Sequence, residues 1–373
     1  MRHIELMDFL KTGFEGASWG TLAMILIGLL FIYLGVFRKM KPMLLISIGF
    51  GILIGNIGTQ VGTFGDSSTL SYLNFELLKG VYPLLIFLGL GAMIDFSALI
   101  ANPKLVLIGI AAQFGIFFAF MVAILFKFPL ESAGAISLIG SADAVSSLFL
   151  ASRLAPELLS AIVITTFLCM AMVPTIQPSI MRLLTTEKER VIKMATPRAV
   201  SQTEKIVFPC VALLLTVFLV PKALPLLGML FFGNLLKECG IIKHLSSTSG
   251  GTLTNVLVVL IGLTVGIFAQ AETFLTTKTL LIFIIGAAAF KTATMSGILF
   301  VKLMNLFLKD GNKINPLIGN AGVSALPDAA QMSQNMGLRY DSSNHLLSHA
   351  MGATAASIIG SALAAGILLR LLG

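Results

Sequence analysis

Long apolar segments recur from one end of this chain to the other, and they constrain its fold more than any other feature. Apolar segments of roughly 17 to 25 residues match the length at which α-helices satisfy their backbone hydrogen bonds across a lipid bilayer. Hydrophobic residues make up 57% of the chain and charged residues only 11%, a balance that a soluble domain of this size does not have. A β-barrel is excluded because the apolar segments lack the alternation of barrel strands. We therefore predict an all-α polytopic membrane protein.

Some of the apolar segments are too short or too interrupted to be regular membrane helices. Segment 43–58 contains several glycines, segment 134–152 contains Asp143, and segment 315–333 contains two prolines and Asp328. Broken or re-entrant backbone at membrane depth is tolerated only where protein or water surrounds it. We expect these segments to line an internal cavity near the membrane midplane. The other candidate membrane segments are 20–37, 81–98, 104–126, 158–183, 205–221, 223–238, 253–270, 279–307 and 345–371.

Two basic clusters provide most of the topology signal. Arg38, Lys39 and Lys41 form the first, and the loop 186–204 carries the second. Because positive residues concentrate in cytoplasmic loops, both clusters are predicted to lie on the cytoplasmic side of the membrane. We attribute the net charge of +8 to these loops and predict no nucleic-acid partner. The chain then divides into an amphipathic N-terminal segment (1–19), N-terminal membrane segments with a polar loop (20–80), a first membrane repeat (81–185), the basic loop, and a second membrane repeat (205–373).

The two halves share a short motif. Leu-Ile-Gly-Ser-Ala at 138–142 returns as Leu-Ile-Gly-Asn-Ala at 317–321, and Leu-Leu-Ser at 158–160 returns at 346–348. Weak repetition around interrupted segments is typical of secondary transporters, whose site lies between inverted repeats. We expect two related repeats, with inverted topology, whose broken helices meet near the midplane. Chance recurrence of common membrane residues is the alternative.

Asp143 is the first candidate for a functional role. An ionisable side chain at the centre of a membrane segment costs roughly 2.5 to 3.5 kcal/mol, so it persists where it faces a cavity or a partner. Its carboxylate and the nearby hydroxyls, including Ser146, are hard oxygen ligands suited to Na⁺ or to a transferable proton. The alternative is an aspartate that caps a half-helix. The two roles are compatible.

The second motif supplies mainly neutral polar groups. Asn315, Asn320, Ser324 and Gln331 can provide oxygen ligands or hydrogen-bond donors, and the two prolines of the segment interrupt the helix. Asp328 is a second acid at membrane depth. It belongs either to the ion site or to a water-filled helix mouth, and the sequence leaves both open.

Other reactive residue types show no site pattern. Cys169, Cys210 and Cys239 are scattered without metal-ligand spacing, and we interpret them as small buried hydrophobic residues. His345 and His349 have no acidic or cysteine neighbours, which favours hydrogen bonding or proton relay over metal binding. Because no Walker or dinucleotide motif is present, the energy source is expected to be an ion gradient or a reaction shared with other subunits.

The chain resembles the membrane-embedded β subunit of sodium-pumping biotin-dependent decarboxylases, which act on oxaloacetate, methylmalonyl-CoA or glutaconyl-CoA. The resemblance covers nearly the whole chain from about residue 20 onward. The matching stretches are Pro83 to Phe96, Ala101 to Lys104, Ala112 to Gly115, Gly140 to Asp143, Phe149 to Leu159, Met172 to Pro178, Thr185 to Arg190, Gly233 to Glu238, Lys302 to Asn305, Asn315 to Gly319, Ala321 to Ala325 and His349 to Gly352.

The resemblance implies a subunit that receives carboxybiotin from a biotin carrier and carboxyltransferase subunit, alongside a small membrane subunit. Loss of CO₂ would drive Na⁺ outward across a bacterial or archaeal inner membrane, and the membrane core would be a trimer. By resemblance, Asp143 and Ser324 are the catalytic residues. Asp143, Asn315, Gly319 and Ser324 would bind Na⁺, and Asn320 beside them is added as a ligand.

Several positions depart from the family pattern. Gly-Gly-Ala-Asp-Gly-Pro-Thr becomes Gly-Ser-Ala-Asp-Ala-Val-Ser at 140–146, Cys169 replaces an expected tyrosine, and Gln331 replaces an expected arginine near the new Asp328. These losses remove a phenol and a guanidinium that could donate protons or hold a carboxylate. Two alternatives therefore stay open: a divergent paralogue uncoupled from decarboxylation, and a stand-alone ion-coupled transporter of a small solute.

Overall fold

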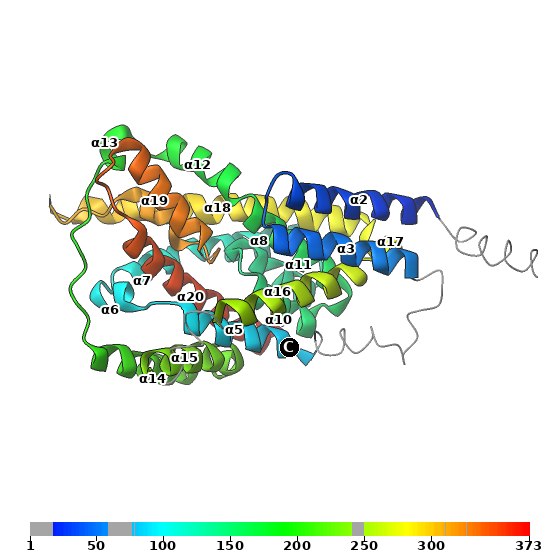
Figure 1. Cartoon of the computed structure of the whole chain (residues 1–373), viewed down its shortest axis with the longest axis horizontal. Coiled ribbons are helices and arrows are strands. Elements are labelled where there is room, and N and C mark those ends of the chain that lie inside the picture. Colours follow the sequence, from blue (N-terminus) through cyan, green and yellow to red (C-terminus); the bar gives the residue numbers. More distant parts are fainter. Residues whose placement is uncertain (1–17, 59–76, 78, 241–249, 310, 326) are drawn as a thin grey trace, which may run out of the picture.

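Helices form all the regular structure in the part of the chain that the computed structural model describes, which is residues 18–58, 77, 79–240, 250–309, 311–325 and 327–373. Five of the described helices are long and apolar enough to cross a membrane, and a bent pair could provide a sixth span. Most helices run along the long axis of the molecule (Figure 1). The predicted all-α polytopic membrane fold is confirmed, whereas the amphipathic segment 1–19 and the polar loop before residue 80 lie almost entirely outside the described residues.

The first half of the chain consists of helices that match most of the predicted segments. Its elements are α2 (Trp19–Val36), α3 (Pro42–Gly58), α5 (Val81–Met93), α6 (Ser97–Ala101), α7 (Leu105–Ala112), α8 (Phe114–Leu125), α9 (Leu130–Ser137), the 3₁₀-helix η2 (Leu138–Ser141), α10 (Ala144–Leu154), η3 (Pro156–Leu158), α11 (Leu159–Ala171), α12 (Val173–Leu184) and α13 (Glu187–Arg190). The bent pair is formed by α11 and α12, which meet at 61°.

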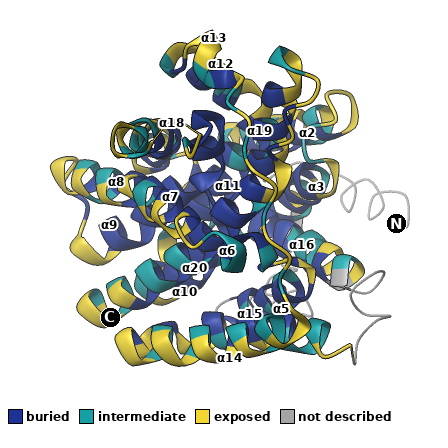
Figure 2. Ribbon diagram, turned by 90° about the vertical axis from the view of Figure 1, so that its left-hand side faces the viewer, coloured by how far each residue is buried: buried dark blue, intermediate teal, exposed yellow. Residues whose placement is uncertain are grey.

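The second half follows a loop along one end of the molecule. Its elements are α14 (Gln202–Leu219), η4 (Pro221–Ala223), α15 (Leu224–Glu238), α16 (Gly250–Ile267), α17 (Ala271–Phe274), α18 (Thr277–Phe307), η6 (Pro316–Gly322), α19 (Asp328–Tyr340) and α20 (Leu347–Leu372). Helix α18, with 31 residues, is the longest of the described helices and contacts η2, η6, α8 and α11. Buried residues concentrate around α11 in the interior, while α14 is largely exposed along one side (Figure 2).

The exposed surface of α14 changes the interpretation of the cysteines. Cys169 on α11 is buried as predicted, but Cys210 on α14 and Cys239 after α15 are exposed. Large apolar side chains such as Leu214 and Phe218 are exposed on the same helix. A membrane helix can present such residues to lipid tails, so an apolar sequence does not distinguish the inside of this bundle from its lipid-facing side.

Helix α3 is continuous, which corrects the prediction that segment 43–58 is broken. Its glycines allow close contact with neighbouring helices instead. A Cβ atom at Gly49 would lie 2.5 Å from the Gly28 carbonyl oxygen of α2, and one at Gly55 would lie 2.0 Å from the Ile267 carbonyl oxygen of α16. Small residues at membrane helix interfaces let the backbones approach in this way.

The two copies of the repeated motif adopt the same kind of backbone. Leu-Ile-Gly-Ser forms η2 and Leu-Ile-Gly-Asn lies within η6, so both segments are broken as predicted. Each motif glycine also packs against a glycine of a neighbouring helix: a Cβ at Gly140 would lie 2.3 Å from the Gly115 carbonyl oxygen of α8, and one at Gly319 would lie 2.4 Å from the Gly297 carbonyl oxygen of α18. This likeness supports the repeat hypothesis, which stays a prediction.

The basic loop 186–204 is anchored to the second half through Arg190. The Arg190 guanidinium is buried and donates to the Tyr340 hydroxyl at 2.7 Å, to the Arg182 carbonyl at 2.8 Å and to the Thr185 hydroxyl at 2.9 Å. The positive-inside bias predicted that both basic clusters share one end of the molecule. Figure 1 places only this loop at an end, because the turn between α2 and α3 lies near the middle of the long axis.

Candidate functional site

Asp143 lies where η2 gives way to α10, and its carboxylate is enclosed by hydrogen-bond donors. Oδ1 accepts from the backbone N–H groups of Val145 and Ser146, each at 3.1 Å, so Asp143 is the N-cap of α10. Oδ2 accepts from the Ser146 hydroxyl at 2.7 Å and from the Ser361 hydroxyl of α20. The residue is only 5% exposed. The capping role is confirmed, and Asp143 also lines a cavity.

Ser324 connects the second broken segment to the first. Its backbone N–H donates to the Ser141 carbonyl at 3.0 Å, and its hydroxyl lies 2.8 Å from the Ser357 hydroxyl. Ser357 in turn accepts a hydrogen bond from the Gln113 side chain at 3.0 Å. The ends of both interrupted segments and one face of α20 therefore converge on a small group of hydroxyl oxygens beside Asp143.

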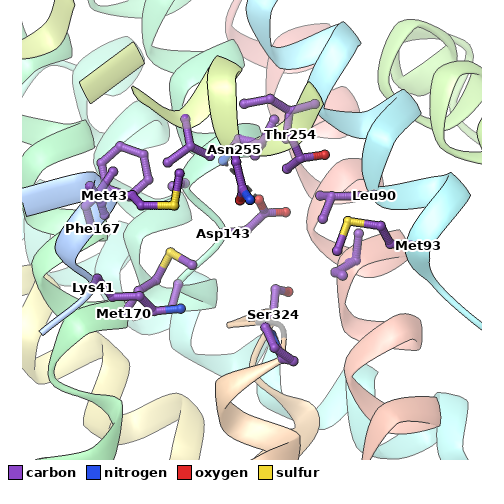
Figure 3. A pocket seen from close by; sticks show the side chains of 18 of the residues that line it. Lys41, Met43, Leu90, Met93, Asp143, Phe167, Met170, Thr254, Asn255 and Ser324 are labelled. Atoms are coloured by element: carbon purple, nitrogen blue, oxygen red, sulfur yellow. Dashed lines mark hydrogen bonds between the residues drawn. The ribbon is translucent and has the colours of Figure 1, made fainter. Parts of the chain in front are cut away.

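Asp143 and Ser324 line a common cavity of about 320 Å³. Figure 3 shows the Asp143 carboxylate near its centre, with Ser324 on one side and Thr254 and Asn255 on the other. Most of the remaining wall is apolar, formed by side chains that include Met43, Ile86, Leu90, Met93, Phe167, Met170 and Val258. An oxygen cluster within an apolar wall strengthens electrostatic interactions with a bound ion or substrate.

The chemistry of this cluster fits a hard monovalent cation. A carboxylate supplies one negative charge, while serine hydroxyls can rotate so that their lone pairs face an ion. The described residues contain no group of three or more histidine, cysteine or acidic side chains that could hold a transition metal. His349 instead pairs through Nε2 with the Ala195 carbonyl at 2.9 Å, in agreement with the expected hydrogen-bonding role.

The other predicted ion ligands lie away from this cavity. Asn315 caps η6 through the Leu317 N–H at 2.9 Å and donates to the Arg190 and Ile192 carbonyls. Asn320 donates to the Gln177 side chain at 2.9 Å, and Gly319 packs against α18. In this structure their visible contacts hold η6 in place, and their ligation of Na⁺ stays a prediction.

Of the additional site candidates, one lies beside the Asp143 cavity and the others lie outside it. Asp328 forms an ion pair with Lys41, whose side chain lines the Asp143 cavity. Gln331 is exposed and donates to Asn335 at 3.0 Å, and Cys169 is buried but does not line the cavity. Neither departure from the family pattern therefore places a new polar group beside Asp143.

Sequence reasoning did not identify Ser357, Ser361, Gln113 or Lys41 as parts of the site. Ser357 and Ser361 are four residues apart and so share one face of α20, which is a recognisable signal. Serines are common in membrane helices, however, and often bond their own backbone. Only the packing of α20 against η2 and α10 selects them.

Gly319→Ala tests whether Gly319 acts through packing. The added Cβ would lie 2.4 Å from the Gly297 carbonyl oxygen, so η6 and α18 must separate. We expect a loss of stability of about 1 to 3 kcal/mol, typical of overpacking, measured as a lower midpoint of thermal unfolding in detergent. Gly228→Ala is the matched control, because its Cβ would meet only the Leu224 side chain at 3.6 Å. An unchanged midpoint for Gly319→Ala, with Na⁺ binding lost, would assign the glycine to the ion site instead.

The fold and the site together define a class: polytopic helical membrane proteins in which a buried, oxygen-lined carboxylate lies between interrupted helices, an arrangement suited to ion translocation. The chain belongs to the family of the Na⁺-transporting oxaloacetate decarboxylase beta subunit, whose pattern matches residues 20–372. The resemblance seen in the sequence is thus confirmed, and with it the assignment to a multi-pass membrane protein.

Curated relatives extend over nearly the full length of the chain. The methylmalonyl-CoA decarboxylase subunit beta of Propionigenium modestum is 44% identical, covering 99% of this chain and 99% of the relative. The glutaconyl-CoA decarboxylase subunit beta of Acidaminococcus fermentans is 43% identical, covering 97% and 96%. The oxaloacetate decarboxylase beta chain of Klebsiella pneumoniae is 40% identical, covering 94% and 95%. The family is therefore shared by proteins named for three different substrates.

Proposed function

We propose that this chain is the Na⁺-translocating membrane subunit of a biotin-dependent decarboxylase, with Asp143 as the residue that binds the transported ion. The observation that carries the proposal is the position of the Asp143 carboxylate, buried beside Ser324 and Ser361 where both interrupted segments meet. A carboxylate is costly at this depth unless an ion, a proton or hydrogen bonds compensate it. Na⁺ bound to Asp143 and adjacent hydroxyls would meet that requirement.

The size of the cavity supports a small carboxylated head group as the second ligand. Ligand pockets span roughly 300 to 1,000 Å³, and a cavity of about 320 Å³ lies at the low end of that range. A coenzyme A thioester is too large for such a space, whereas the bicyclic ring of carboxybiotin is compact. The acyl substrate would therefore react elsewhere in the complex, and a carrier domain would bring only the carboxyl group on biotin to this subunit.

The driving reaction has a simple balance. The bond between the biotin ring nitrogen and the carboxyl carbon breaks, CO₂ leaves, and the ring nitrogen takes up one proton. Ser324 lines the cavity, and its hydroxyl lies 2.8 Å from the Ser357 hydroxyl, so a hydrogen-bonded hydroxyl pair stands beside the place where the ring nitrogen would take up its proton. We propose that proton movement to this nitrogen and Na⁺ release from Asp143 are coupled because both draw on the same oxygen cluster.

The partners follow from the same proposal. A biotin carrier with its carboxyltransferase and a small membrane subunit would complete the complex, and the membrane core would be a homotrimer. Native mass measurement of the purified complex tests the stoichiometry. A monomeric membrane core would contradict the trimer and leave the ion site unaffected.

Transport by the reconstituted complex tests the function. Proteoliposomes that contain the whole complex should accumulate ²²Na⁺ when oxaloacetate, methylmalonyl-CoA or glutaconyl-CoA is supplied, and only the correct substrate should support uptake. Avidin, which sequesters biotin, should stop it. A stand-alone solute carrier would instead transport without a biotin partner, and an uncoupled paralogue would show no substrate-dependent uptake. Either result would contradict the proposal.

A further inference from the structure

An ion pair lies where two cavities adjoin. Lys41 immediately precedes α3 and pairs with Asp328 at the start of α19. Lys41 lines the Asp143 cavity, and it also lines a second cavity of about 790 Å³ together with Arg38, Lys39 and Asp328. Figure 3 shows Lys41 at the edge of the Asp143 cavity, below Met43 and Phe167.

The fold itself gives little reason to place a lysine here. The turn between α2 and α3 leaves Arg38 and Lys39 exposed, whereas Lys41 is half-buried and reaches the Asp143 cavity. A cation directly before a helix opposes the positive N-terminal end of the helix dipole. Lys41 and Lys39 also have positive φ values of 42° and 52°, a backbone region that L-residues seldom adopt and that is often found at functional sites.

Asp328, in contrast, is held in place by its own helix. It lies in the first turn of α19, where a negative side chain interacts favourably with the helix dipole. Both side chains of the pair are only partly buried, at 30% exposure for Lys41 and 28% for Asp328. A partly hydrated pair of this kind can exchange one partner without leaving a charge in a dry interior.

The charges around the Asp143 cavity are few. Among the described residues that line it, Asp143 and Lys41 are the only ionisable side chains. A carboxylate that enters the cavity would therefore find a single charged donor, and charge-assisted hydrogen bonds are about twice as strong as neutral ones. Asp328 neutralises Lys41 when no carboxylate is bound, so that the lysine does not repel Na⁺ from Asp143.

We propose that Lys41 binds the carboxylate of the carboxylated head group and that Asp328 holds Lys41 between turnovers. The inference rests on the proposed function, because it assigns a substrate-binding residue to the same cavity. The exchange breaks no covalent bond: the lysine ammonium leaves the Asp328 carboxylate for the substrate carboxylate and returns after CO₂ is lost.

Two variants of the pair, measured with two readouts, separate substrate binding from a structural role. Lys41→Met should raise the KM for the carboxylated carrier roughly 10- to 100-fold, the range expected when a hydrogen bond to a charged group is lost. Asp328→Asn should weaken ²²Na⁺ binding several-fold without carrier, because Lys41 is then uncompensated near Asp143. The double variant should recover Na⁺ binding but keep the high KM of Lys41→Met.

Lys39→Met is the matched control, since Lys39 belongs to the same turn and lines the second cavity but not the Asp143 cavity. Its KM and Na⁺ affinity should be those of the unmodified complex, and Lys41→Arg should keep most of the activity. An unchanged KM in Lys41→Met would overturn the inference. The inference would also be overturned if the double variant recovered both the KM and the Na⁺ affinity of the unmodified complex, because the ion pair would then serve folding alone. Asp143→Asn, measured alongside, tests the ion site separately.

Discussion

Asp143→Asn is expected to abolish substrate-driven ²²Na⁺ uptake while leaving the fold intact. An asparagine side-chain oxygen can still accept the hydrogen bonds from Val145 and Ser146 that cap α10. The amide that replaces Oδ2 carries no charge and donates where Ser146 and Ser361 now donate, so the oxygen cluster loses its anion. We expect Na⁺ affinity to fall at least about 100-fold, because the Coulomb attraction of a close pair in a partly desolvated site exceeds 2.7 kcal/mol.

Asp95→Asn is the matched control for this change. Asp95 also accepts from a nearby backbone N–H and a serine hydroxyl, both of Ser97, but it is exposed at the end of α5. Transport by this variant should be unchanged. If Asp143→Asn retained Na⁺ uptake equal to that of Asp95→Asn, the transported ion would have to bind elsewhere and the proposed function of the site would be wrong.

Arg190→Ala should cause the largest loss of stability. The Arg190 guanidinium is 8% exposed, bonds to Tyr340, Arg182 and Thr185, and stacks on the Tyr340 ring at 4.7 Å. Removing it leaves buried acceptors unsatisfied in two parts of the chain, so we expect a loss of about 3 to 5 kcal/mol in the free energy of unfolding. The midpoint of thermal unfolding in detergent should fall by at least about 5 °C.

Arg182→Ala controls for the loss of one positive charge from the same region. Its side chain is exposed and bonds only the Pro178 carbonyl, at 3.3 Å, within its own helix. Its unfolding midpoint should shift little. Equal midpoints for the two variants would mean that Arg190 does not link the basic loop to α19.

The helices and their interruptions were predictable because the signals are local. Apolar length gave the boundaries of most spans, and the motif around Asp143 marked a break that appears as η2. The prediction for segment 43–58 was wrong because its outcome depends on neighbouring helices: glycines in a membrane helix either break it or let another helix approach. In α3 they face α2 and α16, which the sequence of α3 alone does not reveal.

The composition of the site was only partly predictable. Asp143 and Ser324 were identified because each interrupts an apolar segment. The structure places both in the wall of one cavity. Asn315 carried the same polar signal, yet it caps η6 and bonds the Arg190 carbonyl. Ser361 carried almost no signal, since one serine in a membrane helix is ordinary. The sequence shows which side chains can form hydrogen bonds, but it does not show which groups they bond to.

The sequence by itself determined that the chain is a helical membrane protein, that its helices break at the two copies of the repeated motif, and that one carboxylate must be compensated at depth. These properties depend on hydrophobicity and backbone hydrogen bonding, which act within single segments. The tertiary structure alone decided that α20 supplies Ser361 to Asp143 and that Lys41 meets Asp328. Those pairs are separated by hundreds of residues, and they form only because the packed helices bring their side chains within hydrogen-bonding distance.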